Sequence, residues 1–372
     1  MAQLITGATG FVGGAIALEL LEQTHADIVC VVRPRGTTTP TERLHRSLTE
    51  AAEAYGRIDL LPDILTRTHA VPGDITESLP SRSEIGRVDA VWHCAASLRF
   101  EDQHVEDIER HNIHGTQAVL KLARDAQANS FNHVSTAYVA GTANGEIPES
   151  AGSAASHHNH YERTKFVSEQ LVAAAPNMQV RILRPSIVIG HSETLAATSS
   201  TGMYGFLREL VTFRDEVSRL LGDLLALRPL RILADADTRL NLIPVNEVAR
   251  QAVAISRSSS TATYFHITNP RPTFLGDAMR LAFNLLSLRQ PLFATSIREL
   301  NAIDQALSDR IPFYGSYLTG TKLFARRNCD AALGTHWPGV DLSSDALQPY
   351  IAWYLRTLGV KEVDECMVAT PR

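Results

Sequence analysis

The sequence predicts an α/β protein, in which a parallel β-sheet is wound on both sides by helices and is joined by a smaller, mainly helical lobe. Three observations predict this fold class. Short apolar runs rich in β-branched residues alternate with helical stretches up to residue 190. A glycine-rich turn joins the first apolar run to the first helical stretch. Beyond Ile189 the alternation stops, and a leucine-rich stretch of helical periodicity begins at Met203.

Seven strands are expected, each a short apolar run bounded by turn-forming residues. They cover residues 3–6, 27–32, 68–72, 90–94, 130–135, 179–184 and 263–268. Helices are expected to begin near Phe11, Thr41, Glu106 and Tyr161. Because strands and helices alternate, they are expected to form right-handed βαβ units, which place the strands in parallel.

The composition is that of an ordinary globular protein, with 44% hydrophobic and 20% charged residues. The formal charge of -5 and the scattered Lys and Arg residues argue against a nucleic-acid partner, which needs a clustered basic surface. The chain has no run of about 18 apolar residues, so no membrane span is predicted. It enters its first strand without the basic and apolar regions of a signal peptide, so a cytoplasmic protein is expected.

The cysteines and histidines do not form a metal-binding pattern. Cys30, Cys94, Cys329 and Cys366 show no CxxC pairing, so neither a disulfide framework nor a zinc site is predicted. Three histidines crowd residues 157–160, but no cysteine or carboxylate stands at ligand spacing from them. No metal is therefore expected.

The turn after the first strand reads Thr6-Gly-Ala-Thr-Gly-Phe-Val-Gly13. Gly7 allows a tight turn, Gly10 lets the backbone approach a pyrophosphate, and Gly13 lets helix and strand pack closely. The preceding strand, the following helix and the βαβ series favour a dinucleotide site over a simple glycine-rich turn. A doubly wound Rossmann fold is therefore predicted. The residues expected to contact the cofactor here are Gly7, Thr9, Gly10, Phe11 and Val12.

The end of the second strand indicates which dinucleotide is bound. An acidic residue there would bind the ribose 2′-hydroxyl of NAD, whereas arginine suits the 2′-phosphate of NADP. The sequence has Arg33 at this point and Arg43 one turn into the next helix, with no carboxylate at the strand end. Charge-assisted bonds from both to phosphate favour NADPH. The alternative is that both are solvated surface arginines.

Two later strand ends are also expected to lie along the cofactor. Asp74 and Ile75 follow the third strand, where they are expected to contact adenine. Ala95, Ala96 and Ser97 follow the fourth strand and are small enough for the backbone to pass beside the cofactor. Either group is also compatible with ordinary loop chemistry, since Asp favours turns.

The division of the chain follows from the same pattern. Residues 1–190 are expected to form the NADP-binding Rossmann domain, to which residues 234–268 return. Residues 191–233 and 269–372 are expected to form a substrate-binding lobe. Leucines between 207 and 233 recur at helical spacing, so they line an apolar pocket, form a lid or belong to the core of the lobe. Attachment to a membrane surface is a weaker alternative, because the stripe lacks a dense basic face.

Tyr161 and Lys165 form a Tyr-x-x-x-Lys pair just before the sixth strand. On a helix this spacing places both side chains on one face, about 5–6 Å apart at Cβ. The ammonium is expected to lower the pKa of the phenol from about 10 toward the working range, which suits proton transfer. Lys165 is also expected to bind the nicotinamide ribose hydroxyls. Such pairs occur by chance on surface helices, and the position downstream of the glycine turn favours the catalytic role.

A third hydroxyl is expected at the end of the fifth strand, where Ser135 and Thr136 are adjacent. Because side chains alternate across a strand, only one of the two can face a substrate carbonyl if the strand persists. Asn112 is expected to hold a water that relays protons to Lys165. Its alternative role is that of an ordinary polar helix residue.

In order and spacing, these motifs resemble the extended short-chain dehydrogenase/reductase family, from the N-terminus to about residue 270. The resemblance selects Thr136 over Ser135 as the active hydroxyl. The family motif also matches Arg184-Pro-Ser-Ile-Val-Ile-Gly190, which implies that Pro185 and Ile187 lie at the cofactor.

Four segments resemble the thioester reductase branch of that family, which includes carboxylic acid reductases, terminal reductase domains of peptide synthetases and fatty acyl-CoA reductases. They are 31–33, 42–44, 134–139 and 239–245. The resemblance implies NADPH and an acyl thioester, reduced by hydride transfer to an aldehyde or on to an alcohol with Tyr161 as proton donor. No adenylation or carrier domain precedes, so an acyl group on a carrier protein or on CoA is expected to arrive in trans. No oligomeric state is predicted.

Two other functions fit the same residues. One is an extended-family ketone or aldehyde reductase, or a sugar-nucleotide-modifying enzyme that uses NAD(P). The arginine-rich end of the second strand disfavours the NAD-retaining sugar enzymes. The other is a non-catalytic NADP-binding sensor, and the intact set of Thr136, Tyr161 and Lys165 argues against it.

Overall fold

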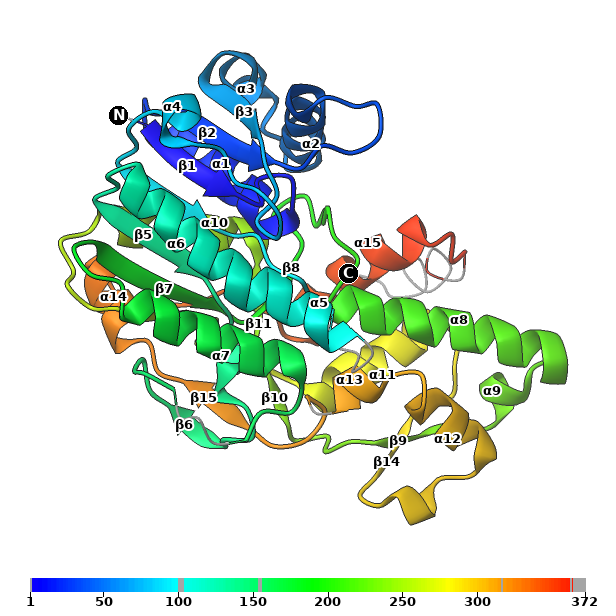
Figure 1. The fold of residues 1–372 in the computed structure, drawn as a ribbon. Helices are drawn as coiled ribbons and strands as arrows, with labels where there is room; N and C mark the ends of the chain where they lie inside the picture. The colour runs from blue at the N-terminus through cyan, green and yellow to red at the C-terminus, as the bar shows by residue number, and fades with distance from the viewer. Residues whose placement is uncertain (1, 100–103, 153–155, 316, 362, 364–372) are drawn as a thin grey trace. The chain divides into compact units, whose positions relative to one another are not determined.

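A computed structural model describes residues 2–99, 104–152, 156–315, 317–361 and 363. It contains a seven-stranded sheet in the order β12-β7-β5-β4-β1-β2-β3 (Figure 1). Every neighbouring pair in this sheet is parallel. The predicted doubly wound α/β fold is confirmed. The strands are β1 (Ala2–Thr6), β2 (Asp27–Val32), β3 (Thr68–Pro72), β4 (Ala90–His93), β5 (Ser130–Val134), β7 (Gln179–Pro185) and β12 (Tyr264–Ile267).

The apolar runs located these strands well, because the strands are buried on both faces. In β2, for example, every residue after Asp27 is buried. The strand order reverses at β1, which pairs with β2 on one side and β4 on the other. In such sheets ligands bind in the crevice at the carboxyl ends of the strands at this reversal. A ligand site is therefore expected beside the residues that follow β1 and β4.

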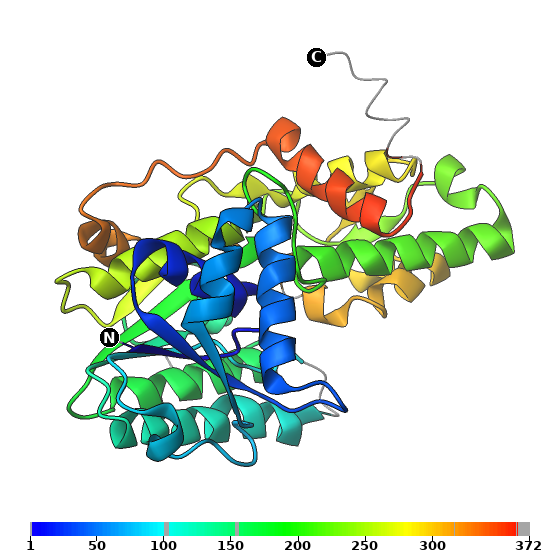
Figure 2. The ribbon, with the colours of Figure 1, turned by 90° about the horizontal axis from the view of Figure 1, so that it is seen from above.

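Helices cover both faces of the sheet (Figures 1 and 2). On one face lie α6 (Gly115–Asp125) and α7 (His160–Ala173), and on the other lie α1 (Phe11–Gln23), α2 (Pro40–Ala54) and α10 (Val245–Arg257). The start of α2 is set by a capping box. Thr39 Oγ1 accepts from Glu42 N, and Glu42 Oε2 accepts from Thr39 N.

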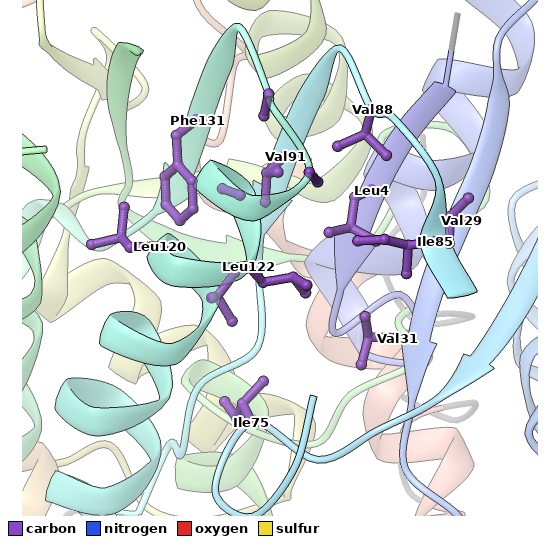
Figure 3. Close-up of a cluster of buried hydrophobic side chains, with 14 of the residues drawn as sticks. Leu4, Val29, Val31, Ile75, Ile85, Val88, Val91, Leu120, Leu122 and Phe131 are labelled. Atoms are coloured by element: carbon purple, nitrogen blue, oxygen red, sulfur yellow. The ribbon is translucent and has the colours of Figure 1, made fainter. Parts of the chain in front are cut away.

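One hydrophobic core cluster lies between the sheet and α6 (Figure 3). The sheet contributes alternate residues of its strands, which all point to one face, and α6 contributes residues at helical spacing. The labelled members are Leu4, Val29, Val31, Ile75, Ile85, Val88, Val91, Leu120, Leu122 and Phe131.

Shorter elements complete the fold. The helical ones are α3 (Leu61–Arg67), α4 (Arg82–Ile85), α5 (Val105–Glu109), α8 (Met203–Leu221), α9 (Leu224–Leu227), α11 (Leu275–Leu285), α12 (Ala302–Ser308), α13 (Pro312–Gly315), α14 (Arg327–Leu333) and α15 (Ser344–Thr357). The strands outside the central sheet are β6 (Gly145–Ile147), β8 (Ile187–Ile189), β9 (Arg231–Leu233), β10 (Arg239–Leu240), β11 (Leu242–Pro244), β13 (Thr273–Phe274), β14 (Leu292–Ala294) and β15 (Lys322–Phe324).

Contacts divide the chain into two compact units. The first comprises Met1–Thr198, Ile243–Thr268 and Phe324–Pro338. The second comprises Ser199–Leu242, Asn269–Leu323 and Gly339–Arg372. The contact units differ from the expected division at residues 191–198 and 324–338, which lie in the first unit, and at 234–242, which lie in the second. Residues 324–338 join the first unit because α14 packs against β12 and α10.

The leucine-rich stretch in the second unit is helical through α8 and α9, but it ends in a strand, β9, which pairs with β14. Its leucines do not all share one environment. Leu207, Leu210, Leu225 and Leu230 are buried, whereas Leu220, Leu221 and Leu227 are exposed. Within the described ranges, none of the helices combines the length and apolar character that a membrane span requires.

Candidate active site

The glycine-rich turn between β1 and α1 is closed by a hydrogen bond from Gly10 N to Gly7 O (3.0 Å). Gly7 has φ +80°, and a Cβ there would lie 2.6 Å from Ala95 N, just after β4. A Cβ at Gly13 would lie 2.2 Å from Gly7 O. Only glycine fits these two positions. The turn therefore brings β1, α1 and the end of β4 together at backbone distance.

The N-terminus of α1 is open to an anion. Thr9 lies in the turn, and Phe11 and Val12 begin the helix. The capping residue, Gly10, makes no side-chain hydrogen bond, and the first helical turn holds no acidic residue. Neither the capping residue nor an acidic side chain of the first turn therefore accepts from the first N–H groups, and the helix dipole adds positive potential. This arrangement fits the pyrophosphate of a dinucleotide.

Four guanidinium groups gather where β2 ends and α2 begins. Arg43 donates a hydrogen bond to the carbonyl of Arg33. Burial is the main cause that lowers the pKa of Arg43, and the charges of Arg33, Arg35 and Arg46 lower it further. Asp74 Oδ2 lies 3.8 Å from Arg33 Nη1 and offsets part of this charge. Arg46 was missed by the sequence analysis, although its position three residues after Arg43 on a helix was a usable clue. A hollow next to Arg46 is completed by Thr37, Thr38, Thr41, Glu42 and His45.

The loop after β3 is shaped by Asp74, whose Oδ1 accepts hydrogen bonds from both Thr76 N and Thr76 Oγ1 at 2.8 Å. The side chain of Ile75 belongs to the hydrophobic core. It packs so closely on α6 that a Cβ at Gly115 would lie 2.8 Å from Ile75 Cδ1. The expected adenine contact of this loop stays a prediction.

Asn112 joins the segment after β4 to α7. It lies in a π-helical turn (Arg110–His114) between α5 and α6, a geometry often found at functional sites. Its Oδ1 accepts from Ser97 N (2.8 Å), and its Nδ2 donates to Ser97 O (3.2 Å) and to Thr164 Oγ1 (3.0 Å). The segment 95–97 is thereby held to the helix that carries Tyr161.

The backbone carbonyl of Asn112 is also engaged. It accepts hydrogen bonds from Thr116 Oγ1 (2.6 Å) and Ser168 Oγ (2.5 Å). These contacts give Asn112 a clamping role that spacing along the sequence does not reveal. Its expected role of holding a water that leads to Lys165 stays a prediction.

Replacing Asn112 with Ala is expected to lower stability by about 1–3 kcal/mol, because the Ser97 N–H and C=O would lose their partners. Cofactor affinity is expected to fall with it, since the segment 95–97 would be released. Thermal unfolding and cofactor titration measure both effects, with Asn144→Ala as an exposed control. Unchanged unfolding in Asn112→Ala would contradict the clamping role.

Helix α7 begins after Asn159, whose side chain accepts a hydrogen bond from Glu162 N (2.9 Å). This start places Tyr161 in the first helical turn and Lys165 in the second. The two residues therefore lie on the same face of α7.

Lys165 reaches the carboxyl edge of the sheet. Its side chain is 2% exposed, and its Nζ donates a hydrogen bond to Val134 O (2.7 Å), the last residue of β5. Lys165 also interacts electrostatically with Cys94, which follows β4. A Cβ at Gly13 would lie 3.2 Å from Cys94 Cβ. The lysine and the glycine turn thus meet at neighbouring strand ends.

The pKa directions at this pair differ from expectation. Burial, and then the charge of Glu162, raises the pKa of Tyr161 above its ordinary value. Burial lowers the pKa of Lys165 to about 8, against the opposing effects of Glu169 and Cys94. Desolvation, which the i, i+4 pattern does not reveal, accounts for the difference. A phenol with a raised pKa stays protonated at neutral pH, so Tyr161 suits the role of proton donor.

Two hydroxyl residues follow β5, which ends at Val134. Thr136 caps a 3-10 turn (Ala137–Ala140), where its Oγ1 accepts from Tyr138 N (3.2 Å). This bond leaves the Thr136 hydroxyl proton available for donation. The Ser135 hydroxyl is buried and has no partner within the described residues. Since the strand ends before both residues, strand alternation does not choose between them.

The end of β7 lies next to β5 in the sheet. Pro185 is its last residue, and Ile187 begins β8. The buried Ser186 hydroxyl between them has no partner in the part of the chain that the structure describes. The expected cofactor contacts of Pro185 and Ile187 stay predictions.

Among the described residues, no three His, Cys, Asp or Glu side chains are grouped so that they could hold a metal ion. In the histidine-rich stretch, the ring of His157 packs on Phe166 at 5.3 Å. Cys30, Cys94 and Cys329 are free thiols, and Cys366 lies outside the described residues.

The comparison with protein families is decisive. A model of the male sterility protein family, which is an NAD-binding family, matches residues 5–252. The chain belongs to the male sterility protein family. The match runs from β1 into α10, so it contains the glycine turn, Asn112, Thr136 and the Tyr161–Lys165 pair. This membership implies a nicotinamide dinucleotide as cofactor, and the expected resemblance to the thioester reductase branch is confirmed.

Curated relatives of this male sterility family member include reductases. A linear gramicidin synthase of Brevibacillus parabrevis is 25% identical over 293 residues, which are 74% of this chain and 5% of that protein. Glycine betaine reductase ATRR of Emericella nidulans is 26% identical over 296 residues, 72% of this chain and 21% of that protein. Fatty acyl-CoA reductase 1 of Mus musculus is 30% identical over 145 residues, 36% of this chain and 28% of that protein. The chain thus matches only a minor part of each relative.

Solved structures share the fold of this male sterility family member. The terminal R domain from the myxalamid PKS-NRPS pathway has a TM-score of 0.75 and 23% identity, covering 97% of this chain and 92% of that chain. A thiolation-reductase di-domain from an archaeal non-ribosomal peptide synthetase has a TM-score of 0.73 and 20% identity, covering 96% and 75%. UDP-glucuronic acid 4-epimerase from Bacillus cereus, solved with NAD, has a TM-score of 0.66 and 18% identity, covering 96% and 100%.

Proposed function

We propose that this chain is an NADPH-dependent reductase that converts an acyl thioester of CoA or of a carrier protein to an aldehyde. The observation that carries the proposal is the position of Lys165 against the end of β5, next to the glycine turn. Tyr161 comes from the same helix as Lys165, and Thr136 follows β5 directly. Reductase domains and fatty acyl-CoA reductases among the relatives support an acyl thioester as the substrate.

The side chains would bind, orient and protonate the substrate. The hydroxyls of Thr136 and Tyr161 hold the acyl carbonyl oxygen and stabilise the negative charge that develops on it. Reduced nicotinamide, when bound, supplies the hydride to the carbonyl carbon. Tyr161 donates its proton to the oxygen, and the charge of Lys165 favours the phenolate that results. The hemithioacetal then collapses, which breaks the C–S bond, expels the pantetheine thiol and leaves an aldehyde.

The arginine cluster supports NADPH rather than NADH. Arg33, Arg35, Arg43 and Arg46 lie close enough for their charges to interact, and Asp74 offsets only part of their charge. An excess of guanidinium groups at the end of β2 suits the 2′-phosphate, which is absent from NADH. The charges of the other three arginines all lower the pKa of Arg43.

Replacing Arg43 with Ala is expected to raise KM for NADPH about 10- to 100-fold, because charge-assisted bonds to the phosphate are lost. KM for NADH is expected to change little. Steady-state kinetics with both cofactors measure the ratio, and Arg124→Ala, an exposed residue on α6, is the control. An equal loss with both cofactors would place Arg43 elsewhere than at the 2′-phosphate.

The function itself is tested with a panel of acyl-CoA and acyl-pantetheine thioesters. NADPH consumption is followed by absorbance, and the products are identified as aldehyde, alcohol or free thiol. Release of one thiol for each NADPH consumed is the expected result, and alcohol formation would indicate a second reduction. Consumption with ketones but with no thioester would overturn the proposal in favour of a ketone reductase.

A further inference from the structure

Two buried histidines lie side by side beneath the proposed active site. His93 of β4 and His133 of β5 are register partners in the sheet, and each is 1% exposed. Their ring centroids are 5.3 Å apart, with 33° between the ring planes. His133 Nε2 lies 3.4 Å from Lys165 Nζ. Neither histidine was singled out from the sequence.

The hydrogen bonds around His93 determine its tautomer. Thr116 Oγ1 donates its only proton to Asn112 O (2.6 Å), so it must accept from His93 Nε2–H (3.0 Å). His93 Nδ1 then accepts from Thr6 Oγ1 (2.8 Å). Burial, and then the charge of Lys165, lowers the pKa of His93 to about 3. His93 is therefore a neutral ring with both nitrogens committed.

His133 is neutral as well, but its nitrogens are not committed in this way. Burial, followed by the charges of Lys165 and His93, holds its pKa well below the ordinary value. Its Nδ1 has no hydrogen-bond partner within the described residues. Only the contact with Lys165 remains to decide which ring nitrogen carries the proton.

We infer that His133 is a positioning residue for Lys165. The His133 ring accepts a hydrogen bond from the Lys165 ammonium, and after exchange of tautomer it donates one to the neutral Lys165 amine. A neutral imidazole can do either at Nε2, because the proton resides on Nδ1 in one tautomer and on Nε2 in the other. The lysine nitrogen thus keeps a partner in both protonation states. The catalytic meaning of this inference rests on the proposed function.

The other groups that face Lys165 support this role for His133. Glu169 lies one turn further along α7. His93 is the last residue of β4, and Cys94 follows it. At the end of β5, Val134 O accepts a hydrogen bond from Lys165 Nζ. Among these, the Val134 carbonyl is an acceptor only. It can stabilise the ammonium but cannot donate to a neutral amine. His133 supplies what that carbonyl lacks.

The lysine titration tests the inference directly. The chain has four lysines, Lys121, Lys165, Lys322 and Lys361, so isotope-labelled lysine gives a simple NMR spectrum. In His133→Leu both protonation states of Lys165 lose a partner, but the ammonium loses the stronger, charge-assisted bond, so the midpoint of the Lys165 titration is expected to fall by about one pH unit. His133→Gln keeps an acceptor and a donor, so its midpoint is expected to match the wild type. Lys121, exposed and 2.8 Å from Asp125, serves as the reference that must not move.

A second measurement needs no substitution. Nitrogen-15 shifts of the His133 ring in the wild-type protein report its tautomer as a function of pH. We expect the proton on Nδ1 below the Lys165 midpoint and on Nε2 above it. One tautomer throughout, or an unshifted Lys165 midpoint in a folded His133→Leu variant, would overturn the inference. Neither measurement uses substrate, so failure of the thioester assay would not affect them, and their failure would leave that assay interpretable.

Discussion

Tyr161→Phe is expected to lower kcat/KM for thioester reduction by roughly 10²–10⁴, the usual range for loss of a positioned proton donor. The substitution removes one hydroxyl and keeps the ring, so the packing of α7 and the affinity for the cofactor should be preserved. The wild-type phenol should remain protonated through neutral pH, because burial raises its pKa. Stopped-flow reduction with saturating cofactor, together with a separate cofactor titration, measures the two effects.

A matched variant controls for loss of a hydroxyl as such. Tyr55→Phe removes a hydroxyl that is bonded to Thr198 Oγ1 (3.3 Å) after the C-terminal end of α2. Its kcat/KM is expected to stay within about twofold of wild type. If Tyr161→Phe retained full activity, the proposed proton donor would be wrong, while the family assignment would stand.

The second large effect is expected from Gly13→Ala, which should weaken cofactor binding about 10- to 100-fold. The added Cβ would lie 2.2 Å from Gly7 O, a backbone atom that cannot rotate away. Helix α1 must then move off β1, and overpacking of this kind costs roughly 1–3 kcal/mol. Fluorescence titration with NADPH and thermal unfolding report the two consequences.

Gly14→Ala is the control for this variant, since it adds the same methyl group one residue later in the same helix. Its Cβ would lie 3.2 Å from Ala8 O, so a shift of a few tenths of an ångström accommodates it. Cofactor binding is expected to stay close to wild type. Equal losses in both variants would show that α1 tolerates no added methyl group, and the close approach at Gly13 would lose its special meaning.

The sheet was predictable from the sequence because its strands are buried and their local composition reflects that burial. The bounds of β2 and β3 are the predicted ones, and the start of α2 follows from the local pair Thr39 and Glu42. The glycine turn was equally predictable, since Gly7 has φ +80° and a Cβ at Gly13 would lie 2.2 Å from Gly7 O. Each of these features is determined by residues nearby in the chain.

The rest of the site depends on neighbours in space, which the sequence does not show. The spacing of Tyr161 and Lys165 was visible, but the burial that raises the pKa of the first and lowers that of the second was not. The clamping contacts of Asn112 join residues 15 and 52 positions apart. His133 could be recognised only after the fold had placed it beside Lys165.

The first unit is built from three separate segments of the chain, and this limits which truncated fragments of the protein can fold. The edge strand β12 and the helix α10, which packs on α1, both come from residues after 243, and α14 comes later still. A truncated chain that stops at Thr198 would leave β7 as a bare edge strand and would uncover the apolar side of α1. A nucleotide-binding fragment of this protein must therefore combine the three segments of the first unit, because truncation from one end would expose surfaces that aggregate.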